Sequence, residues 1–158
     1  MKNTKLIIEK MKLSDFDALR ALWGESGLHL ASYARGKHEL DLLIRFNTES
    51  CIVAKNNETI IGTAIGAFNG KRAWIYHVAV GPKWQKKGIG SVLLKHVEEI
   101  LKKKGATKIF LGIAFTNLKV APFYSKHGYT VMNDAFVMEK DIYEEKQALT
   151  EEGGIHEN

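Results

Sequence analysis

The sequence predicts a mixed α/β fold with its elements in the order β-α-α-β-β-β-α-β-α-β-β. Two observations lead to this class. Three strand-like segments joined by short turns fill residues 51–80, which indicates an antiparallel meander. An amphipathic helix over residues 88–104 then separates the strand-like segments 74–80 and 108–115, and such a unit pairs two parallel strands through a right-handed crossover. The fold is therefore restricted to a sheet with an antiparallel first half and one parallel pair.

The first elements are a short strand and two helices. Residues 6–8 form the strand, and Ser14 is expected to cap the first helix, with an acidic residue three positions later as in a capping box. Apolar side chains then recur at helical spacing until Gly24 and Gly27 end that helix. A second helix is predicted over residues 37–46, where leucines and an isoleucine share one side.

The meander consists of three strands with two local turns. Residues 51–54 and 59–68 are the first two strands, and the turn at residues 56–58 joins them. Asn69-Gly70 predicts a two-residue hairpin into the third strand, because both residues tolerate positive φ.

The remaining elements follow the crossover helix, which ends at Gly105 as a C′ glycine. A short helix is predicted over residues 120–126. Two closing strands, 129–132 and 136–141, are predicted to form a hairpin around an Asn-Asp turn.

The 158 residues suit one domain, predicted over residues 1–143, followed by an acidic and flexible tail over residues 144–158. No run of 18 apolar residues occurs, so no membrane span is expected, and the N-terminus lacks the apolar stretch of a signal peptide. The single cysteine, Cys51, excludes an internal disulfide, and the histidines lack metal-ligand spacing, so no metal is expected. A cytoplasmic location is the expectation.

The charge is unevenly distributed. The whole chain carries +5, but the tail has five glutamates and one lysine, which leaves +9 on residues 1–143. A net charge of +9 on residues 1–143 favours an anionic partner such as nucleic acid, a membrane surface or a phosphorylated cofactor. Nucleic acid is disfavoured, because the basic stretches lack interleaved aromatic residues and any known binding motif.

The most informative segment covers residues 78–91 and runs from the end of the third meander strand through a short loop into the start of the crossover helix. Its last seven residues are Gln85, Lys86, Lys87, Gly88, Ile89, Gly90 and Ser91. Two glycines allow close approach of backbone N–H groups to a ligand, and a helix N-terminus adds partial positive charge, so the segment predicts a pyrophosphate cradle. A Walker A loop is absent, and Leu93 occupies the place of a dinucleotide fingerprint's third glycine. The alternative is a loop that only turns the chain.

Residues 85–90 resemble the Gln/Arg-x-x-Gly-x-Gly/Ala signature of the GCN5-related N-acetyltransferases, the GNAT superfamily. The signature follows a strand with that family's apolar-x-Val pattern at Val78 and Val80. About 30 residues later, residues 117–129 resemble the second family signature, with its asparagine, its alanine, its Phe-Tyr pair and its Gly-Tyr end. The order of elements along residues 5–142 also fits the family.

The resemblance implies an acyl-CoA N-acyltransferase fold with acetyl-CoA as co-substrate, in which the two parallel strands splay apart. The pantetheine arm would pair with the backbone of Val78, Ala79 and Val80, the pyrophosphate would lie on the amides of residues 85–91, and the lysines would meet the phosphates. The implied reaction is transfer of acetyl to a primary amine by direct attack in a ternary complex. The alternative is a non-catalytic acyl-CoA sensor or structural module of the same fold.

Amide formation from a thioester needs a neutral amine, a polarised carbonyl and a protonated leaving thiolate. Tyr124 matches the family's tyrosine for the acid role, and a phenol pKa of about 10 suits a departing thiol. Its alternative role is a packed aromatic side chain beside Phe123. The resemblance gives the Val78 N–H the task of polarising the carbonyl. It gives Asn117 a hydrogen bond to the cofactor arm or between the splayed strands, with capping of the short helix as the alternative.

The base is where the sequence departs from the family, since many members carry Glu or Asp where this chain has Tyr76 and His77. His77 can take a proton near neutral pH, directly or through water, but a strand histidine can also be structural. Tyr76 is expected to line the acceptor site, and Glu25 is a further candidate base. The acceptor itself, a small amine or a protein amino group, stays open. The family often forms homodimers, so a homodimer is possible.

Overall fold

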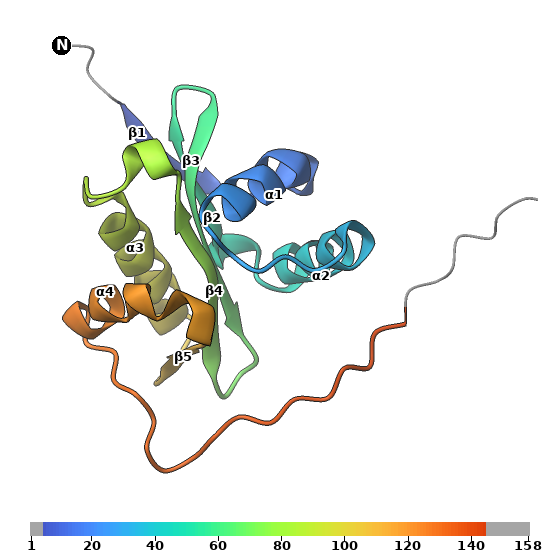
Figure 1. Cartoon of the computed structure of the whole chain (residues 1–158), viewed down its shortest axis with the longest axis vertical. Helices are drawn as coiled ribbons and strands as arrows, with labels where there is room; N and C mark the ends of the chain where they lie inside the picture. Colours follow the sequence, from blue (N-terminus) through green and yellow to red (C-terminus); the bar gives the residue numbers. More distant parts are fainter. Residues whose placement is uncertain (1–4, 145–158) are drawn as a thin grey trace, which may run out of the picture.

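The computed structural model of the chain describes residues 5–144, and it contains a five-stranded mixed sheet with helices on both faces (Figure 1). The strands stand in the order of the sequence, with antiparallel pairing from the first to the fourth and parallel pairing between the last two. They are β1 (Leu6–Lys10), β2 (Cys51–Asn56), β3 (Thr59–Phe68), β4 (Ala73–Val80) and β5 (Ile109–Leu111). The predicted mixed α/β class and its single parallel crossover are confirmed.

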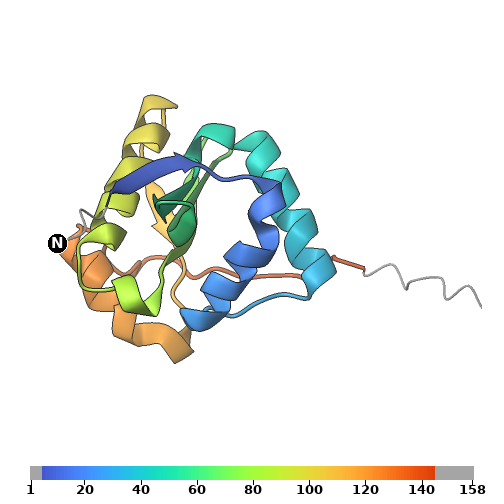
Figure 2. The same cartoon turned by 90° about the horizontal axis from the view of Figure 1, so that it is seen from above.

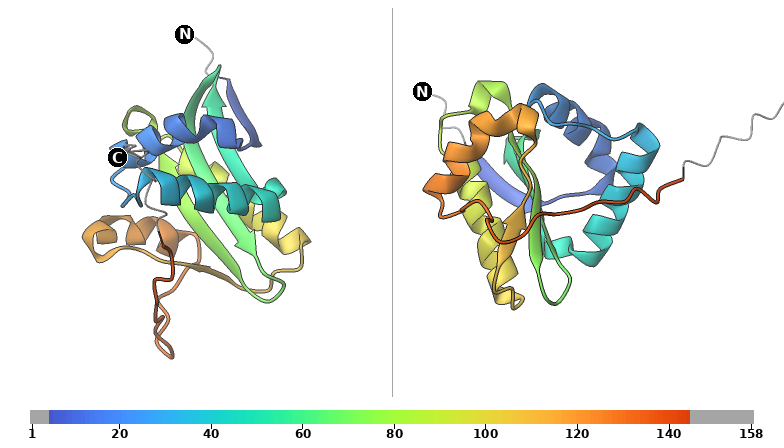
Figure 3. Two further views of the ribbon diagram at one scale, coloured as in Figure 1. Left: turned by 90° about the vertical axis from the view of Figure 1, so that its right-hand side faces the viewer. Right: turned by 60° about the horizontal axis from the view of Figure 1, so that its bottom comes forward.

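The helices form two outer layers. On one face lie α1 (Phe16–Glu25) and α2 (Tyr33–Phe46), and on the other lie α3 (Ile89–Lys103) and α4 (Ala121–Lys126), as Figures 2 and 3 show. Each layer packs on its own apolar cluster, with Leu93 at the centre of the α3 side and Leu19 in the α1 side, both fully buried. Among residues 5–144, the helices are either too short or too polar to cross a membrane.

The start and the end of α1 differ from the prediction. Ser14 does not cap this helix, because it lies inside a 3₁₀ turn, η1 (Leu13–Asp15), and the N-cap residue Asp15 makes no side-chain cap bond. Gly24 lies inside α1, and the chain turns at Gly27, whose φ is +78°. A single glycine costs a helix only about 1 kcal/mol, which the packing of the buried α1 side chains offsets.

The second helix begins four residues before the predicted residue 37. The Ser32 Oγ accepts a hydrogen bond from the Arg35 backbone N–H at 3.3 Å, which satisfies one of the free donors at the start of α2. The sequence did not predict this start, because residues 33–36 show little apolar periodicity and a single serine is a weak indication of a helix cap.

The β3–β4 turn occurs where predicted, but it is not a two-residue hairpin. Four residues, 69–72, join the strands, and only Gly70 has positive φ, at +92°. The Asn69 Oδ1 instead accepts the backbone N–H groups of Lys71 and Arg72 at 2.9 and 2.8 Å. The asparagine therefore stabilises the turn through its side chain rather than through a left-handed backbone.

The strand predicted over residues 108–115 is only three residues long. β5 pairs with Ala73, Trp74 and Ile75 and then separates from β4, so the residues after Leu111 have no neighbouring strand on that side. The chain continues as a 3₁₀ segment, η4 (Phe115–Val120), into α4. Alternating apolar side chains alone could not reveal this divergence, because a strand also needs a partner.

The predicted closing hairpin, 129–132 with 136–141, is absent. Residues 130–143, here named the arm, run extended from α4 to the side of α2, where Arg35 forms an ion pair with Asp141 at 2.7 Å (Figures 1 and 3). Within residues 5–144 the arm pairs with no strand, and β5 ends at Leu111. The predicted acidic tail, residues 144–158, lies outside the described residues apart from Glu144.

Candidate active site

The last five residues of β4 leave one strand edge unpaired. β4 contacts β5 only through residues 73–75, so Tyr76–Val80 has no β5 partner among the described residues. Val78, Ala79 and Val80 thus border the gap between the two parallel strands. Backbone N–H and C=O groups on such an edge can pair with an extended ligand arm.

A bulge in β4 shapes this edge. Tyr76 pairs with Ile65 and Ala79 pairs with Thr63, so two β4 residues oppose a single β3 residue between them. One of the two is His77, whose φ of +48° is left-handed and unusual for a residue with a side chain. The bulge redirects the side chain of His77 toward the α1–α2 layer.

A buried hydrogen-bond chain fixes the bulge. The Trp23 Nε1–H donates to the Thr63 hydroxyl at 2.9 Å, and that hydroxyl donates to the His77 carbonyl oxygen at 2.7 Å. The His77 ring also stacks on Trp23, with centroids 4.3 Å apart and planes 19° apart. α1, β3 and β4 therefore hold His77 from both its backbone and its ring.

Burial shifts the titration of the two aromatic neighbours on β4. Desolvation lowers the pKa of His77 below its ordinary value, and the charge of Glu39 only partly opposes this effect. The imidazole is therefore neutral at pH 7 and able to accept a proton. Desolvation raises the pKa of Tyr76, which stays protonated, and its side chain is 41% exposed.

The loop after β4 presents free backbone donors. Lys86 and Gly88 have φ of +61° and +83°, and Gly88 is the N-cap of α3, with no side chain to bond the first amides of the helix. The N–H groups of Ile89, Gly90 and Ser91 precede the first intrahelical bond and point out of the helix start. This geometry suits a phosphate group.

Further contacts bring this loop next to β4 and α4. The Gln85 side chain donates to the Val80 carbonyl oxygen at 3.0 Å, and the Lys87 ammonium lies 5.2 Å from the Trp84 ring centroid. A Cβ on Gly90 would stand 3.4 Å from the Phe123 ring, so glycine permits the close packing of α3 on α4. The predicted cradle residues and the free edge of β4 thus meet in one place.

Tyr124 lies on α4, packed edge-on against Phe123 and Tyr129 with centroid distances of 5.1 and 5.9 Å. Burial raises the pKa of its phenol, and within residues 5–144 no hydrogen-bond partner takes its hydroxyl. A protonated phenol without a partner is available to donate to a ligand.

Asn117 lies in η4, between β5 and α4, with a non-helical φ of −125°. The suggested helix-capping role is wrong, because Val120 is the N-cap of α4 and no side chain caps that helix. The further candidate base Glu25 and the single cysteine lie away from the site. Glu25 ends α1 on its exposed side, and the Cys51 thiol is fully buried, with its pKa raised to about 11 by desolvation.

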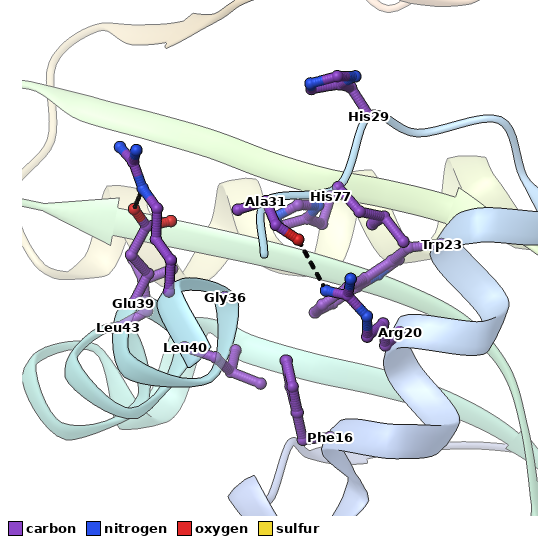
Figure 4. A pocket seen from close by; sticks show the side chains of 12 residues that line it. Phe16, Arg20, Trp23, His29, Ala31, Gly36, Glu39, Leu40, Leu43 and His77 are labelled. Atoms are coloured by element: carbon purple, nitrogen blue, oxygen red, sulfur yellow. Dashed lines mark hydrogen bonds and ion pairs between the residues drawn. The ribbon is translucent and has the colours of Figure 1, made fainter. Parts of the chain in front are cut away.

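A cavity of about 360 Å³ lies between α1, α2 and β4 (Figure 4). Its lining residues are Phe16, Arg20, Trp23, His29, Leu30, Ala31, Arg35, Gly36, Glu39, Leu40, Leu43 and His77. Of the predicted catalytic residues, His77 lies on this wall, whereas Tyr76 and Tyr124 do not line it, and neither does the further candidate base Glu25. Sequence reasoning missed Arg20 and Glu39, because long polar side chains on amphipathic helices resemble an ordinary solvent face.

An unpaired strand edge beside an uncapped helix start suits an extended ligand that carries phosphate. The sequence model of the Acetyltransferase (GNAT) family matches residues 16–129, and the chain belongs to this family, which uses acetyl-CoA. The predicted resemblance is confirmed.

Individual relatives agree with the family. The chain is 26% identical over 140 residues to Acetyltransferase ECA0875 of Pectobacterium atrosepticum, covering 89% of this chain and 98% of that protein. Among solved structures it is similar to Ard1 from Thermoplasma volcanium, with a TM-score of 0.72, 19% identity, and coverage of 81% and 84%. It is also similar to PaiA N-acetyltransferase from Thermoplasma acidophilum in complex with coenzyme A, with a TM-score of 0.68, 24% identity, and coverage of 81% and 91%.

Proposed function

We propose that this protein is an acetyl-CoA-dependent N-acetyltransferase that acts on a primary amine by direct attack in a ternary complex. The observation that carries the proposal is the unpaired edge of β4, which lies between the amide cradle of α3 on one side and the His77 wall of the cavity on the other. A similar structure named as an N-acetyltransferase holds coenzyme A, which supports this assignment. Residues 1–143 constitute the catalytic domain, acting in the cytoplasm.

The residues present fit acetyl-CoA. The free amides of residues 89–91 suit the pyrophosphate, and Lys83, Lys86 and Lys87 are exposed around them to meet phosphate charge. The edge formed by residues 78–80 suits the extended pantetheine arm. Asn117 carries a side-chain amide without a partner among the described residues, and it lies where the two strands have separated, so it suits a hydrogen bond to that arm.

The chain's own groups divide the chemistry of the transfer. His77, neutral and stacked on Trp23, takes a proton from the acceptor ammonium, directly or through water, and so generates the neutral amine that attacks. The Val78 N–H donates to the carbonyl oxygen as negative charge develops on it. A nitrogen–carbon bond forms, the carbon–sulfur bond breaks, and Tyr124 gives its proton to the departing thiolate. The nitrogen then loses its second proton to solvent, and solvent restores the proton of the Tyr124 phenol. Tyr76, half-exposed next to His77, lines the path of the acceptor.

Calorimetric titration with acetyl-CoA tests the proposal. Binding should weaken about 10- to 100-fold with dephospho-acetyl-CoA, because charge-assisted contacts to the 3′-phosphate are lost. The double variant Lys86→Gln with Lys87→Gln should reduce this difference, whereas Lys102→Gln with Lys103→Gln, at the far end of α3, should keep it.

The outcomes separate the candidate functions. Acetyl-CoA binding followed by release of free thiol with an amine panel supports the enzyme. Tight binding without transfer to any amine would favour the non-catalytic acyl-CoA module. No binding at all would contradict both readings.

A homodimer is part of the proposal, and the arm supports it. Val131, Phe136 and Met138 are 93%, 86% and 83% exposed, and several large apolar side chains exposed on one short segment favour an interface. Sedimentation should give twice the 17.8 kDa of one chain. Phe136→Asp with Met138→Asp should yield monomers, while Phe46→Asp, at an exposed end of α2, should not. A wild-type protein with the mass of one chain would contradict the dimer.

A further inference from the structure

One cation on the cavity wall has no anionic partner. The half-buried guanidinium of Arg20 donates to the Ala31 carbonyl oxygen at 2.9 Å, and across residues 5–144 no carboxylate lies within ion-pair distance of it. Arg35, on the same cavity, instead meets the carboxylates of Glu39 and Asp141 at 2.8 and 2.7 Å. A guanidinium has five donors, so most of those on Arg20 remain for a ligand.

The surroundings hold Arg20 in place. Its guanidinium carbon lies 5.8 Å from the centroid of the Tyr33 ring, and the Tyr33 hydroxyl is itself tied to Asp17 at 2.7 Å. A Cβ on Gly36 would stand 3.4 Å from the Phe16 ring and 3.6 Å from the Arg20 Nη1, so the glycine lets α2 pass close to this group. A positioned guanidinium binds a planar anion with little loss of side-chain entropy.

The two ends of the cavity differ in charge, because Arg20 has no carboxylate partner among residues 5–144, whereas at the other end two carboxylates, Glu39 and Asp141, share the single cation Arg35. Figure 4 shows the Glu39 carboxylate, bonded to Arg35, at one end and Arg20 at the other, with His77 between them. Apolar side chains of Leu30, Leu40 and Leu43 complete the wall. The volume of about 360 Å³ lies at the small end of the range for small-molecule sites.

We infer that the acceptor is a small primary amine that also carries an anionic group, a carboxylate or a phosphate, and that Arg20 binds this group. The inference rests on the proposed function and deepens it. The amine faces His77 and is attracted by the Glu39 carboxylate, while the anionic group lies against Arg20. A large peptide amine without a nearby anion would leave the Arg20 charge unmatched.

Matched acceptor pairs test the inference. Phosphoethanolamine is compared with ethanolamine, and leucine with leucinamide, as kcat/KM for acetyl transfer. The anionic member of at least one pair should have a kcat/KM about 10- to 100-fold higher, because a charge-assisted hydrogen bond strengthens binding by about this factor. Preference in the first pair identifies a phosphate, and preference in the second identifies a carboxylate.

Variants assign the preference to Arg20. Arg20→Gln should abolish it mainly through KM, Arg20→Lys should restore part of it, and Arg45→Gln should keep it, because Arg45 pairs with Asp41 on the exposed side of α2. Equal rates within both pairs, or a preference that survives in Arg20→Gln, would overturn the inference.

A failure of the proposed function can be distinguished from a failure of the inference about Arg20. If acetyl-CoA binds but no amine of the panel or of these pairs is acetylated, the proposed transfer is contradicted, and thermal stabilisation by phosphoethanolamine and by leucine is then measured in the presence of coenzyme A. Stabilisation of the wild type that is lost in Arg20→Gln would support the anion site, and no stabilisation of the wild type would overturn it.

Discussion

Replacing Tyr124 with phenylalanine should lower kcat for acetyl transfer by about 100- to 10,000-fold, the usual contribution of a general acid. The ring contacts with Phe123 and Tyr129 do not use the hydroxyl, so the fold and acetyl-CoA binding should be retained. Release of the coenzyme A thiol measures the rate, and calorimetry measures the binding. Because burial raises the pKa of Tyr124 above its usual value of about 10, the loss should be the same at every pH from about 6 to 9.

Tyr129→Phe is the matched control for this prediction. The Tyr129 hydroxyl donates to the Glu98 carboxylate at 3.0 Å and is thus occupied within the protein. This variant should keep its turnover, apart from a modest loss of stability. Turnover of Tyr124→Phe equal to that of the wild type would remove Tyr124 from the acid role and leave it as a packed aromatic side chain.

Local patterns in the sequence were sufficient to predict the central strand β3 and the crossover helix α3. The strand predicted over residues 59–68 has the same bounds as β3, and the helix predicted over 88–104 differs from α3 by one residue at each end. Both elements contain their own periodicity and end at turn residues such as Gly105. The cradle over residues 85–91 stays a prediction, and it rests on a glycine-bearing helix start that lies within seven consecutive residues.

Features that depend on distant partners were not predictable in this way. The arm has the apolar pattern of a strand, but a strand exists only where another strand pairs with it, and β5 ends at Leu111. The cavity is similar, because it needs Arg20 from α1, Glu39 from α2 and His77 from β4 to face one another. The local sequence around Arg20 and Glu39 is that of solvent-exposed helix residues, and the local sequence around His77 is that of an ordinary histidine in a strand.

The second large effect is expected from Trp23→Ala, which should lower the free energy of unfolding by about 3–5 kcal/mol. Trp23 is 4% exposed, and its removal leaves a cavity between α1 and the sheet and takes away the hydrogen bond that the Thr63 hydroxyl accepts. Denaturant unfolding monitored by circular dichroism measures the loss. Trp74→Ala serves as the comparison, because Trp74 is only half-buried and should cost less. An equal or smaller loss in Trp23→Ala would contradict the central place of this residue in the core.

Thr63→Val separates the role of Trp23 in packing from its role in the site. The valine fills the same volume but leaves the Trp23 indole N–H and the His77 carbonyl oxygen without their partner, which should cost about 1–3 kcal/mol of stability. Because this hydroxyl fixes the left-handed backbone of His77, kcat should also fall, whereas acetyl-CoA binding at the α3 cradle should persist. Thr59→Val, at the exposed start of β3, should change neither quantity. A Thr63→Val protein that loses stability but keeps its full kcat would show that the bulge holds its shape without the hydrogen-bond chain, and the positioning of His77 would then depend on its stacking with Trp23 alone.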